Sequence, residues 1–310
     1  MLLEVEHLHH EFGVGPGAAV ALQDISFSVD RGEFLSIVGP SGSGKTTLLR
    51  CICALTRPTS GQIRVDGGLV TSVPQQLAIV FQDYGRSLFP WLRVRDNVEM
   101  PLRRLPIDAA ERKERIATSL AEVGLADVES RYPWQLSGGM QQRVAIARAL
   151  AYKPALLLMD EPFASVDAQT RADLQDTLLE IWTRHESTVL FVTHDIDESV
   201  YLADRVVVLS RPPTTVQAEI DVDLPRPRDQ IATKELARFV ELRADVARLI
   251  RRPVGAEAEE RSAAASPAGP DQEPASLPDA APGSPLADRA VGADRPVPAD
   301  RPVAADRPRP

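Results

Sequence analysis

The feature that most restricts the fold of this chain is the run Gly39-Pro40-Ser41-Gly42-Ser43-Gly44-Lys45-Thr46-Thr47. It follows an apolar segment with the pattern of a strand, Phe34 to Val38, and it opens a segment with the pattern of a helix. Glycines let successive backbone amides turn toward a phosphate group, and the start of the helix adds a favourable dipole. Lys45 supplies a positive charge, and the Thr46 hydroxyl suits Mg²⁺. The run therefore predicts a loop that binds the triphosphate of ATP or GTP.

The composition indicates a globular protein with one large domain and an appendage: 310 residues, 44% hydrophobic and 25% charged. The formal charge of -9 argues against binding to nucleic acid through general electrostatics. The start of the chain lacks the basic and apolar regions of a secretion signal, and no apolar run approaches the roughly 18 residues of a spanning helix. We therefore expect a cytosolic protein, with Cys51 and Cys53 as small buried thiols.

The distribution of apolar residues predicts an α/β domain. Five segments with the pattern of buried strands alternate with helical stretches and predict a mostly parallel core sheet: Phe34 to Val38, Ala78 to Phe81, Leu156 to Asp160, Val189 to Thr193 and Val206 to Leu209. Short alternating patterns at Leu2 to Glu6, Ile25 to Val29 and Gln62 to Asp66 predict a small antiparallel β subdomain. Helical periodicity predicts a helical subdomain at about residues 94–151.

The C-terminal part of the chain differs from the rest in composition. No aromatic residue follows Phe239, and beyond Pro253 the sequence is rich in proline and alanine and contains a repeated Asp-Arg pair. Such a segment cannot bury enough apolar surface to offset the entropy of ordering. We therefore expect a folded domain over residues 1–253 and a disordered tail over 254–310. The domain should end in an amphipathic helix from Ile231 to Ile250 that packs on its surface.

Two adjacent carboxylates, Asp160 and Glu161, end a predicted core strand. Burying both charges there is costly unless they serve a function. Asp160 suits a metal ion, held directly or through water. Glu161, on the other side of the strand, suits the orientation or deprotonation of an attacking water. In such sheets ligands bind at the carboxyl ends of the strands, where the phosphate loop is also expected.

A second helix start in the chain is suited to an anion. Ser137 is a natural N-cap for the helix that follows, and Gly138 and Gly139 keep side chains away from its amino end. One chain thus contains two phosphate-receptive helix starts. This is one more than a single nucleotide needs, unless the second start serves a nucleotide held by another subunit.

These features resemble the motifs of the nucleotide-binding subunits of ABC transporters. The resemblance covers residues 1 to about 253 and rests on the phosphate loop, Gln82 in Phe81-Gln82-Asp83, Leu136-Ser137-Gly138-Gly139, Leu158-Met159-Asp160-Glu161, Ser165-Val166-Asp167 and Thr193-His194-Asp195, in that order. It implies an ATPase that binds ATP and Mg²⁺. It also implies a head-to-tail dimer with a second copy of the chain, in which each ATP lies between one phosphate loop and the Ser137 to Gly139 turn of the other subunit.

The resemblance also implies roles for individual residues. Gln82 links the metal ion and the water to the permease contact, Asp167 acts across the dimer, and His194 senses the γ-phosphate. Phe12 is expected to stack on adenine, although His10 competes for that place. The implied catalytic residues are thus Glu161, His194 and Gln82, and the implied metal ligands are Thr46, Gln82 and Asp160.

The sequence contains no membrane segment, so the resemblance implies separate transmembrane permease subunits and a peripheral place at the cytoplasmic face of the cell membrane. This arrangement resembles bacterial importers, which indirectly use a periplasmic or lipid-anchored solute-binding protein. The stretches Arg86 to Trp91 and Asp195 to Leu209 resemble the branch that imports nitrate, sulfonates, taurine and bicarbonate. The apolar residues Leu88 to Leu92 are where such a permease is expected to dock.

Two other functions are compatible with parts of this pattern. A soluble ABC-type ATPase acting on nucleic acid or ribosomes usually has a second nucleotide domain or a long coiled-coil arm, and neither is evident here. A regulatory module that hydrolyses little ATP is disfavoured by Glu161 and His194. A small GTPase is excluded because the sequence has no Asn-Lys-x-Asp run. A metal site at His7, His9 and His10 is disfavoured, since strand alternation puts only two of the three on one face.

Overall fold

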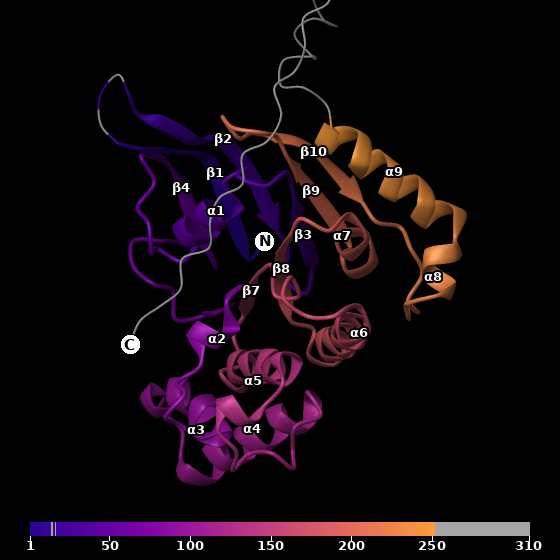
Figure 1. The fold of residues 1–310 in the computed structure, drawn as a ribbon. Helices are drawn as coiled ribbons and strands as arrows, with labels where there is room; N and C mark the ends of the chain where they lie inside the picture. The colour runs from indigo at the N-terminus through magenta and orange to yellow at the C-terminus, as the bar shows by residue number, and fades with distance from the viewer. Residues whose placement is uncertain (14, 16, 252–310) are drawn as a thin grey trace, which may run out of the picture. The chain divides into compact units, whose positions relative to one another are not determined.

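A six-stranded sheet lies at the centre of the structure, a computed structural model that describes residues 1–13, 15 and 17–251 (Figure 1). The strands follow the spatial order β10 (Val216–Asp221), β9 (Arg205–Leu209), β3 (Phe34–Val38), β8 (Thr188–Thr193), β7 (Leu156–Asp160) and β6 (Leu77–Val80). Only β10 is antiparallel to its neighbour. Strands β3, β7 and β8 are buried along their whole length, which explains why most of their residues are apolar. The predicted α/β fold with a mostly parallel core sheet is confirmed.

A second, antiparallel sheet contains β2 (Ala19–Val29), β1 (Leu3–Phe12), β4 (Ser60–Val65) and β5 (Gly68–Leu69), in that spatial order. Strands β1 and β2 are longer than predicted. Their pairing shifts register between Val5 and Leu8, and the backbone of His7 and of Asp24 has positive φ angles of 49° and 55°. These bulges interrupt the alternation of apolar and polar residues, so the sequence pattern revealed only part of each strand.

The core sheet separates two hydrophobic cores. On β7, Leu156 and Leu158 belong to the core shared with the antiparallel sheet and α1 (Lys45–Ile52), whereas Leu157 and Met159 belong to the core shared with the other helices. This alternation fixes which strand residues face each layer. The thiols of Cys51 and Cys53, at the end of α1, are buried and free as predicted, and burial raises their pKa values to about 11 and about 12.

Residues 84–151 form helices and no strand, which confirms the helical subdomain of the predicted fold (Figure 1). They comprise α2 (Tyr84–Ser87), α3 (Val94–Glu99), the 3₁₀ segment η1 (Met100–Arg104), α4 (Ala109–Glu122), η2 (Pro133–Gln135) and α5 (Gly138–Ala151). Asp108 caps α4 by accepting a hydrogen bond of 2.8 Å from the Glu111 amide. Helix α5 packs against α3 and α4 and also contacts α6 (Ala168–His185), so it connects the helical subdomain to the core.

The described part of the chain ends in two helices, α8 (Ala232–Glu235) and α9 (Ala237–Arg251), where the sequence predicted one. The single helix was wrong because Leu236 has an extended ψ of 134° that separates the two. Helix α9 buries Phe239, Leu242 and Val246 against α7 (Ile196–Leu202) and β9, which confirms that this segment packs on the domain.

The tail predicted for residues 254–310 lies outside the described residues. Within residues 1–13, 15 and 17–251, no helix is both long and apolar enough to span a membrane.

Candidate active site

The phosphate loop, residues 39–44, joins the carboxyl end of β3 to the start of α1. Gly44 occupies the N-cap with φ 73°, and a Cβ there would lie 2.9 Å from Leu22 Cδ2. A Cβ on Gly39 would lie 3.1 Å from the Leu209 carbonyl oxygen. The position of Gly44 therefore requires glycine, and a side chain at Gly39 would press on β9. The first amides of α1 have no partner within the helix, so they are available to an anion in the loop. Thr47 follows within α1.

The Lys45 ammonium group lies within this loop and is largely buried, with 6% of the side chain exposed. Its Nζ donates hydrogen bonds to the carbonyl oxygens of Gly39, at 2.9 Å, and Pro40, at 3.1 Å. Glu161 Oε1 is 3.8 Å away. Burial lowers the pKa of Lys45, and the charges of Glu161 and Asp160 oppose this shift. The arrangement holds a cation where the phosphates of a nucleotide would lie.

Thr46 and Asp160 bring two oxygen ligands together beside this cation. The Thr46 hydroxyl donates to Asp160 Oδ1 at 3.4 Å. Asp160 is 5% exposed, and burial raises its pKa, although the hydrogen bond from Thr46 and the charge of Lys45 act in the opposite direction. A carboxylate and a hydroxyl are ligands that Mg²⁺ accepts, and Mg²⁺ takes its remaining ligands from water and phosphate. These two residues fit a magnesium ion, which would also offset the cost of burying the Asp160 charge.

Glu161 lies where three core strands end. Its backbone has a positive φ of 44°, and its amide donates to the Val192 carbonyl at 2.8 Å. Glu161 Oε2 accepts a hydrogen bond from Gln82 Nε2 at 3.0 Å and is 3.0 Å from His194 Nδ1. The strand has therefore ended before Glu161, and strand alternation, which placed this side chain on the opposite face from Asp160, does not apply to it. A carboxylate fixed in this way can orient a water molecule and accept its proton.

The predicted residues thus converge from different parts of the chain. Lys45, Gln82 and His194 all reach Glu161, which follows β7. Gln82 follows β6 and His194 follows β8, the two neighbours of β7 in the sheet. Gln82 contacts Glu161 rather than the Thr46 and Asp160 pair, so its role as a metal ligand stays a prediction.

The turn Ser137–Gly139 lies at the start of α5 in the helical subdomain. Ser137 is exposed and caps the helix, since its Oγ accepts a hydrogen bond of 3.3 Å from the Met140 amide. A Cβ on Gly139 would lie 2.5 Å from Cγ2 of Thr170, in the first turn of α6. Glycine at this position lets the amino ends of α5 and α6 approach closely. The turn is therefore an exposed helix start packed against a second helix start.

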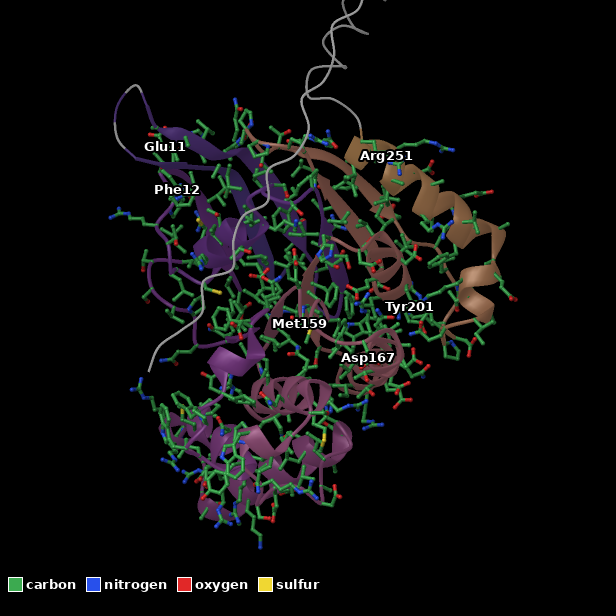
Figure 2. All side chains as sticks on the ribbon, viewed as in Figure 1. Glu11, Phe12, Met159, Asp167, Tyr201 and Arg251 are labelled. Carbon is green, nitrogen blue, oxygen red and sulfur yellow. The ribbon has the colours of Figure 1, made fainter. Side chains whose placement is uncertain are left out.

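Asp167 caps that second helix, α6 (Figure 2). Its Oδ1 accepts a hydrogen bond from the Thr170 amide at 3.0 Å, and this bond, with others from nearby groups, lowers the pKa of the exposed carboxyl. The side chain stays ionised at the amino end of the helix, where a negative charge is favourable. An interaction of Asp167 across a dimer stays a prediction.

Phe12 and His10 differ in their availability to a nucleotide base. Phe12 lies at the end of β1 in the antiparallel sheet and is 54% exposed (Figure 2). His10 is 7% exposed, and its ring meets that of Phe12 edge-on, with 4.7 Å between the centroids. Phe12 therefore offers an open aromatic face, whereas His10 is buried beside it. Stacking of either ring on adenine stays a prediction.

Two charged residues next to the predicted site were missed in the sequence analysis. Arg171, on α6, and Glu198, on α7, each lie four residues after a predicted site residue, Asp167 and His194 respectively. Four residues is about one helical turn, so each side chain lies above the start of its own helix. Glu198 is 6% exposed. The sequence signal for a buried charge at Glu198 was its position shortly before the apolar run Val200 to Leu202.

Comparisons with known proteins place the chain in a family. The family described as ABC transporter matches residues 22–164. An uncharacterized ABC transporter ATP-binding protein of Methanocaldococcus jannaschii is 46% identical, over 80% of this chain and 91% of its own length. The nitrate import ATP-binding protein NrtD of Synechocystis sp. is 44% identical, over 86% of this chain and 100% of its own length. The nitrate transport protein NasD of Klebsiella oxytoca is 40% identical, over 79% and 94%.

Solved structures agree with this placement. A structure described as the dimeric form of a bacterial ABC transporter cassette is 32% identical, covers 71% of this chain and 99% of its own, and has a TM-score of 0.63. The same cassette was also solved as a dimer in a post-hydrolysis state bound to ADP and Pi, with a TM-score of 0.63. The family match includes Lys45, Gln82, Ser137, Asp160 and Glu161 of the candidate site. The chain belongs to the ATP-binding proteins of ABC transporters and is an ATPase of the ABC type.

Proposed function

We propose that this chain is the Mg²⁺-dependent ATPase subunit of a bacterial importer that takes up nitrate through a separate permease. The observation that carries the ATPase role is the convergence of Lys45, Gln82 and His194 on the Glu161 carboxylate. The proposal of nitrate rests on relatives named for nitrate import or transport, at 40–44% identity. The chain would act at the cytoplasmic face of the membrane.

In this proposal the triphosphate of ATP is bound by backbone N–H groups of the phosphate loop and of the start of α1, and by the Lys45 ammonium group. Thr46 and Asp160 would hold Mg²⁺, which supplies charge neutralisation between the phosphates when it is bound. Glu161 orients the attacking water and accepts its proton. Gln82 and His194 fix the Glu161 carboxylate, each at 3.0 Å from the same oxygen. Proton transfer of this kind contributes roughly 10²–10⁴-fold to a rate.

The proposed site is completed by a second copy of the chain. The turn Ser137–Gly139 is an exposed helix start with a hydroxyl cap, and no acidic residue lies in the first turn of its helix. Such a helix start attracts a phosphate group. A head-to-tail dimer would bring this turn onto the γ-phosphate held by the other subunit. One solved cassette similar to this chain is described as a dimer in two structures, which supports the arrangement.

The surface around residues 88–92 is where we propose that the permease docks. Leu88 is buried, whereas Trp91 is 70% exposed and lies against Phe89, with 5.4 Å between the ring centroids. Asn97 holds this segment, since its Oδ1 accepts from the Phe89 amide at 2.8 Å and its Nδ2 donates to the Leu92 carbonyl at 3.1 Å. A rigid loop with an exposed tryptophan suits the apolar centre of a protein interface. A solute-binding protein on the far side of the membrane would deliver the solute to the permease.

Growth of the source strain with nitrate as the only nitrogen source tests the proposal. We expect a strain carrying Glu161→Gln to fail on nitrate and to grow normally on ammonium. Glu180→Gln is the matched control, because Glu180 is exposed on α6. Growth of the Glu161 variant on nitrate would contradict nitrate as the cargo. Failure on taurine as the only sulfur source instead would assign the chain to sulfonate uptake. The purified Glu161→Gln protein should still bind ATP and should lose at least about 100-fold in hydrolysis.

A further inference from the structure

Arg171 contacts two turns that the proposed mechanism treats separately. Its Nη2 donates to the Val166 carbonyl at 3.2 Å, next to Asp167. Its Nη1 is 3.6 Å from Asp195 Oδ2, and its Nε is 3.8 Å from Glu198 Oε1. The guanidinium group of this side chain, which is 32% exposed as a whole, therefore bridges the turn before α6 and the turn after β8. The contact to Val166 is a hydrogen bond, whereas the contacts to Asp195 and Glu198 are ion pairs. A planar guanidinium group, with its charge spread over three nitrogens, can hold all three at once, which an ammonium group cannot reproduce.

Glu198 extends this contact to the backbone on both sides of His194. Glu198 Oε2 accepts a hydrogen bond of 2.7 Å from the Thr193 hydroxyl, and that hydroxyl in turn accepts from the Asp195 amide at 3.0 Å. The Glu198 amide donates to Asp195 Oδ1 at 3.1 Å. The two neighbours of His194 are thus tied to a buried carboxylate that faces Arg171. The position of the His194 ring, 3.0 Å from Glu161, depends on these bonds.

On its other side, the turn before α6 packs against the Ser137–Gly139 turn. A Cβ on Gly139 would lie 2.5 Å from Thr170 Cγ2 and 3.7 Å from Val166 Cγ1, so the side chains of Thr170 and Val166 pack directly on Gly139. Because closely packed side chains leave little free volume, a displacement of one of these turns moves the other turn as well. A continuous set of contacts therefore connects the Ser137–Gly139 turn, through Val166 and Arg171, to His194.

We propose that Arg171 is a positioning residue that couples the Ser137–Gly139 turn to His194 within one chain. This inference rests on the proposed function, in which the partner's ATP occupies that turn. Binding of the partner's γ-phosphate would then hold the α5 and α6 starts in place, and Arg171 would align His194 at the chain's own ATP. The two ATP sites of the dimer would thereby become competent together, because each depends on a turn engaged by the other site's nucleotide.

The test compares Arg171→Met with Arg184→Met in the purified protein. Arg184 lies on the same helix, is 57% exposed and is 3.7 Å from Glu122, so it serves as the matched control. We expect Arg171→Met to lower kcat about tenfold, with the Kd for ATP within about twofold of the parent value, since coupling rather than binding is lost. In the Glu161→Gln background, ATP should still produce the dimer. An unchanged kcat, or loss of the ATP-dependent dimer, would overturn the proposal.

A double variant separates positioning from charge neutralisation. Arg171→Met alone leaves Glu198 buried without a cation, which can unfold the domain. Arg171→Met combined with Glu198→Gln removes both charges and should restore the melting temperature. We expect kcat of this double variant to stay about tenfold low, no lower than either single variant, since both residues belong to one set of contacts. Recovery of the parent kcat, or a roughly hundredfold loss, would contradict the coupling.

The two proposals fail in distinguishable ways. Absence of Mg²⁺-dependent hydrolysis by the unmodified protein would contradict the proposed function itself. Normal hydrolysis by the unmodified protein together with normal hydrolysis by the Arg171→Met protein would leave the ATPase function intact and would overturn only the coupling.

Discussion

The chain contains two helix starts suited to phosphate, at α1 and at α5, and their surroundings differ. The start of α1 has buried charged side chains beside it: Lys45 and Asp160 are 6% and 5% exposed, and Glu161 is close by. The start of α5 has an exposed Ser137 cap and no acidic residue in its first turn. The first is a preorganised site with its own cation and carboxylates, whereas the second contributes only amides and a hydroxyl. This difference explains why the second suits a nucleotide held mainly by another subunit.

The largest expected effect comes from placing a charge at the exposed helix start. Aspartate caps a helix as well as serine does, so Ser137→Asp should preserve the fold. In the proposed dimer its carboxylate would face the γ-phosphate of the partner's ATP, and juxtaposed like charges cost several kcal/mol. We expect kcat for ATP hydrolysis to fall about 100-fold or more, while the Kd for ATP, measured on a single chain, stays unchanged.

Ser137→Asn is the matched control for this variant, because asparagine also caps the helix but carries no charge. Its kcat should stay within about tenfold of the parent value. If kcat fell equally in the two variants, the loss would come from removing the Ser137 hydroxyl and not from adding a negative charge.

The second effect concerns the buried helix start. Removal of the Lys45 ammonium group by Lys45→Met should raise the Kd for ATP about 30-fold, since a charge-assisted contact to phosphate contributes about 2 kcal/mol. Isothermal titration with ATP measures this change. Lys113→Met, an exposed lysine on α4, is the control and should leave the Kd unchanged. If Lys45→Met lowered only kcat, the buried start would not be the principal ATP site.

The sequence predicted the buried region better than the exposed one. Each predicted core strand lies within one residue of its observed ends, because a strand covered on both faces is apolar over most of its length. The antiparallel strands were underestimated where bulges at His7 and Asp24 interrupt the alternation. The break at Leu236 was missed because it depends on the conformation of one residue in an otherwise helical pattern.

In the candidate site, local sequence patterns identified some residues, whereas the contacts of others depend on the fold. Loop, strand and spacing patterns identified Lys45, Asp160 and Glu161, which the structure brings together. The position of Glu161 could not be derived from strand alternation, because its backbone turns at φ 44°. Arg171, on α6, contacts Asp195 and Glu198, which lie 24 and 27 residues later in the sequence, before and within α7. Such contacts arise from packing in space, which local patterns do not encode.

The third effect tests the close packing behind the exposed helix start. Gly139→Ala would bring a Cβ to 2.5 Å from Thr170 Cγ2. Overpacking of this kind costs about 2 kcal/mol, which corresponds to a fall of roughly 4–8 °C in the melting temperature of a domain of this size. Addition of Thr170→Ser removes the clashing methyl group and should restore most of the loss, whereas Thr170→Ser alone should change little. Failure of this rescue would mean that the two helix starts do not depend on each other.

The smallest expected effect concerns the cost of preorganising the buried start. Burial raises the pKa of Asp160 above its ordinary value of 3.8, so the folded state binds this proton more tightly than the unfolded chain does. The free energy of unfolding therefore falls as the pH rises from 3.8 through the folded-state pKa, and the cost of burying the Asp160 charge is fully present at neutral pH.

Asp160→Asn removes this buried charge and should raise the melting temperature without nucleotide by about 2–4 °C at pH 7, on the order of 1 kcal/mol. With Mg²⁺ and ATP the order should reverse, because only the carboxylate binds the metal tightly. If the Asp160→Asn protein without nucleotide were less stable than the parent, burial of the Asp160 charge would not be destabilising. Ser137→Asn, at the exposed helix start, is the control and should not raise the melting temperature comparably.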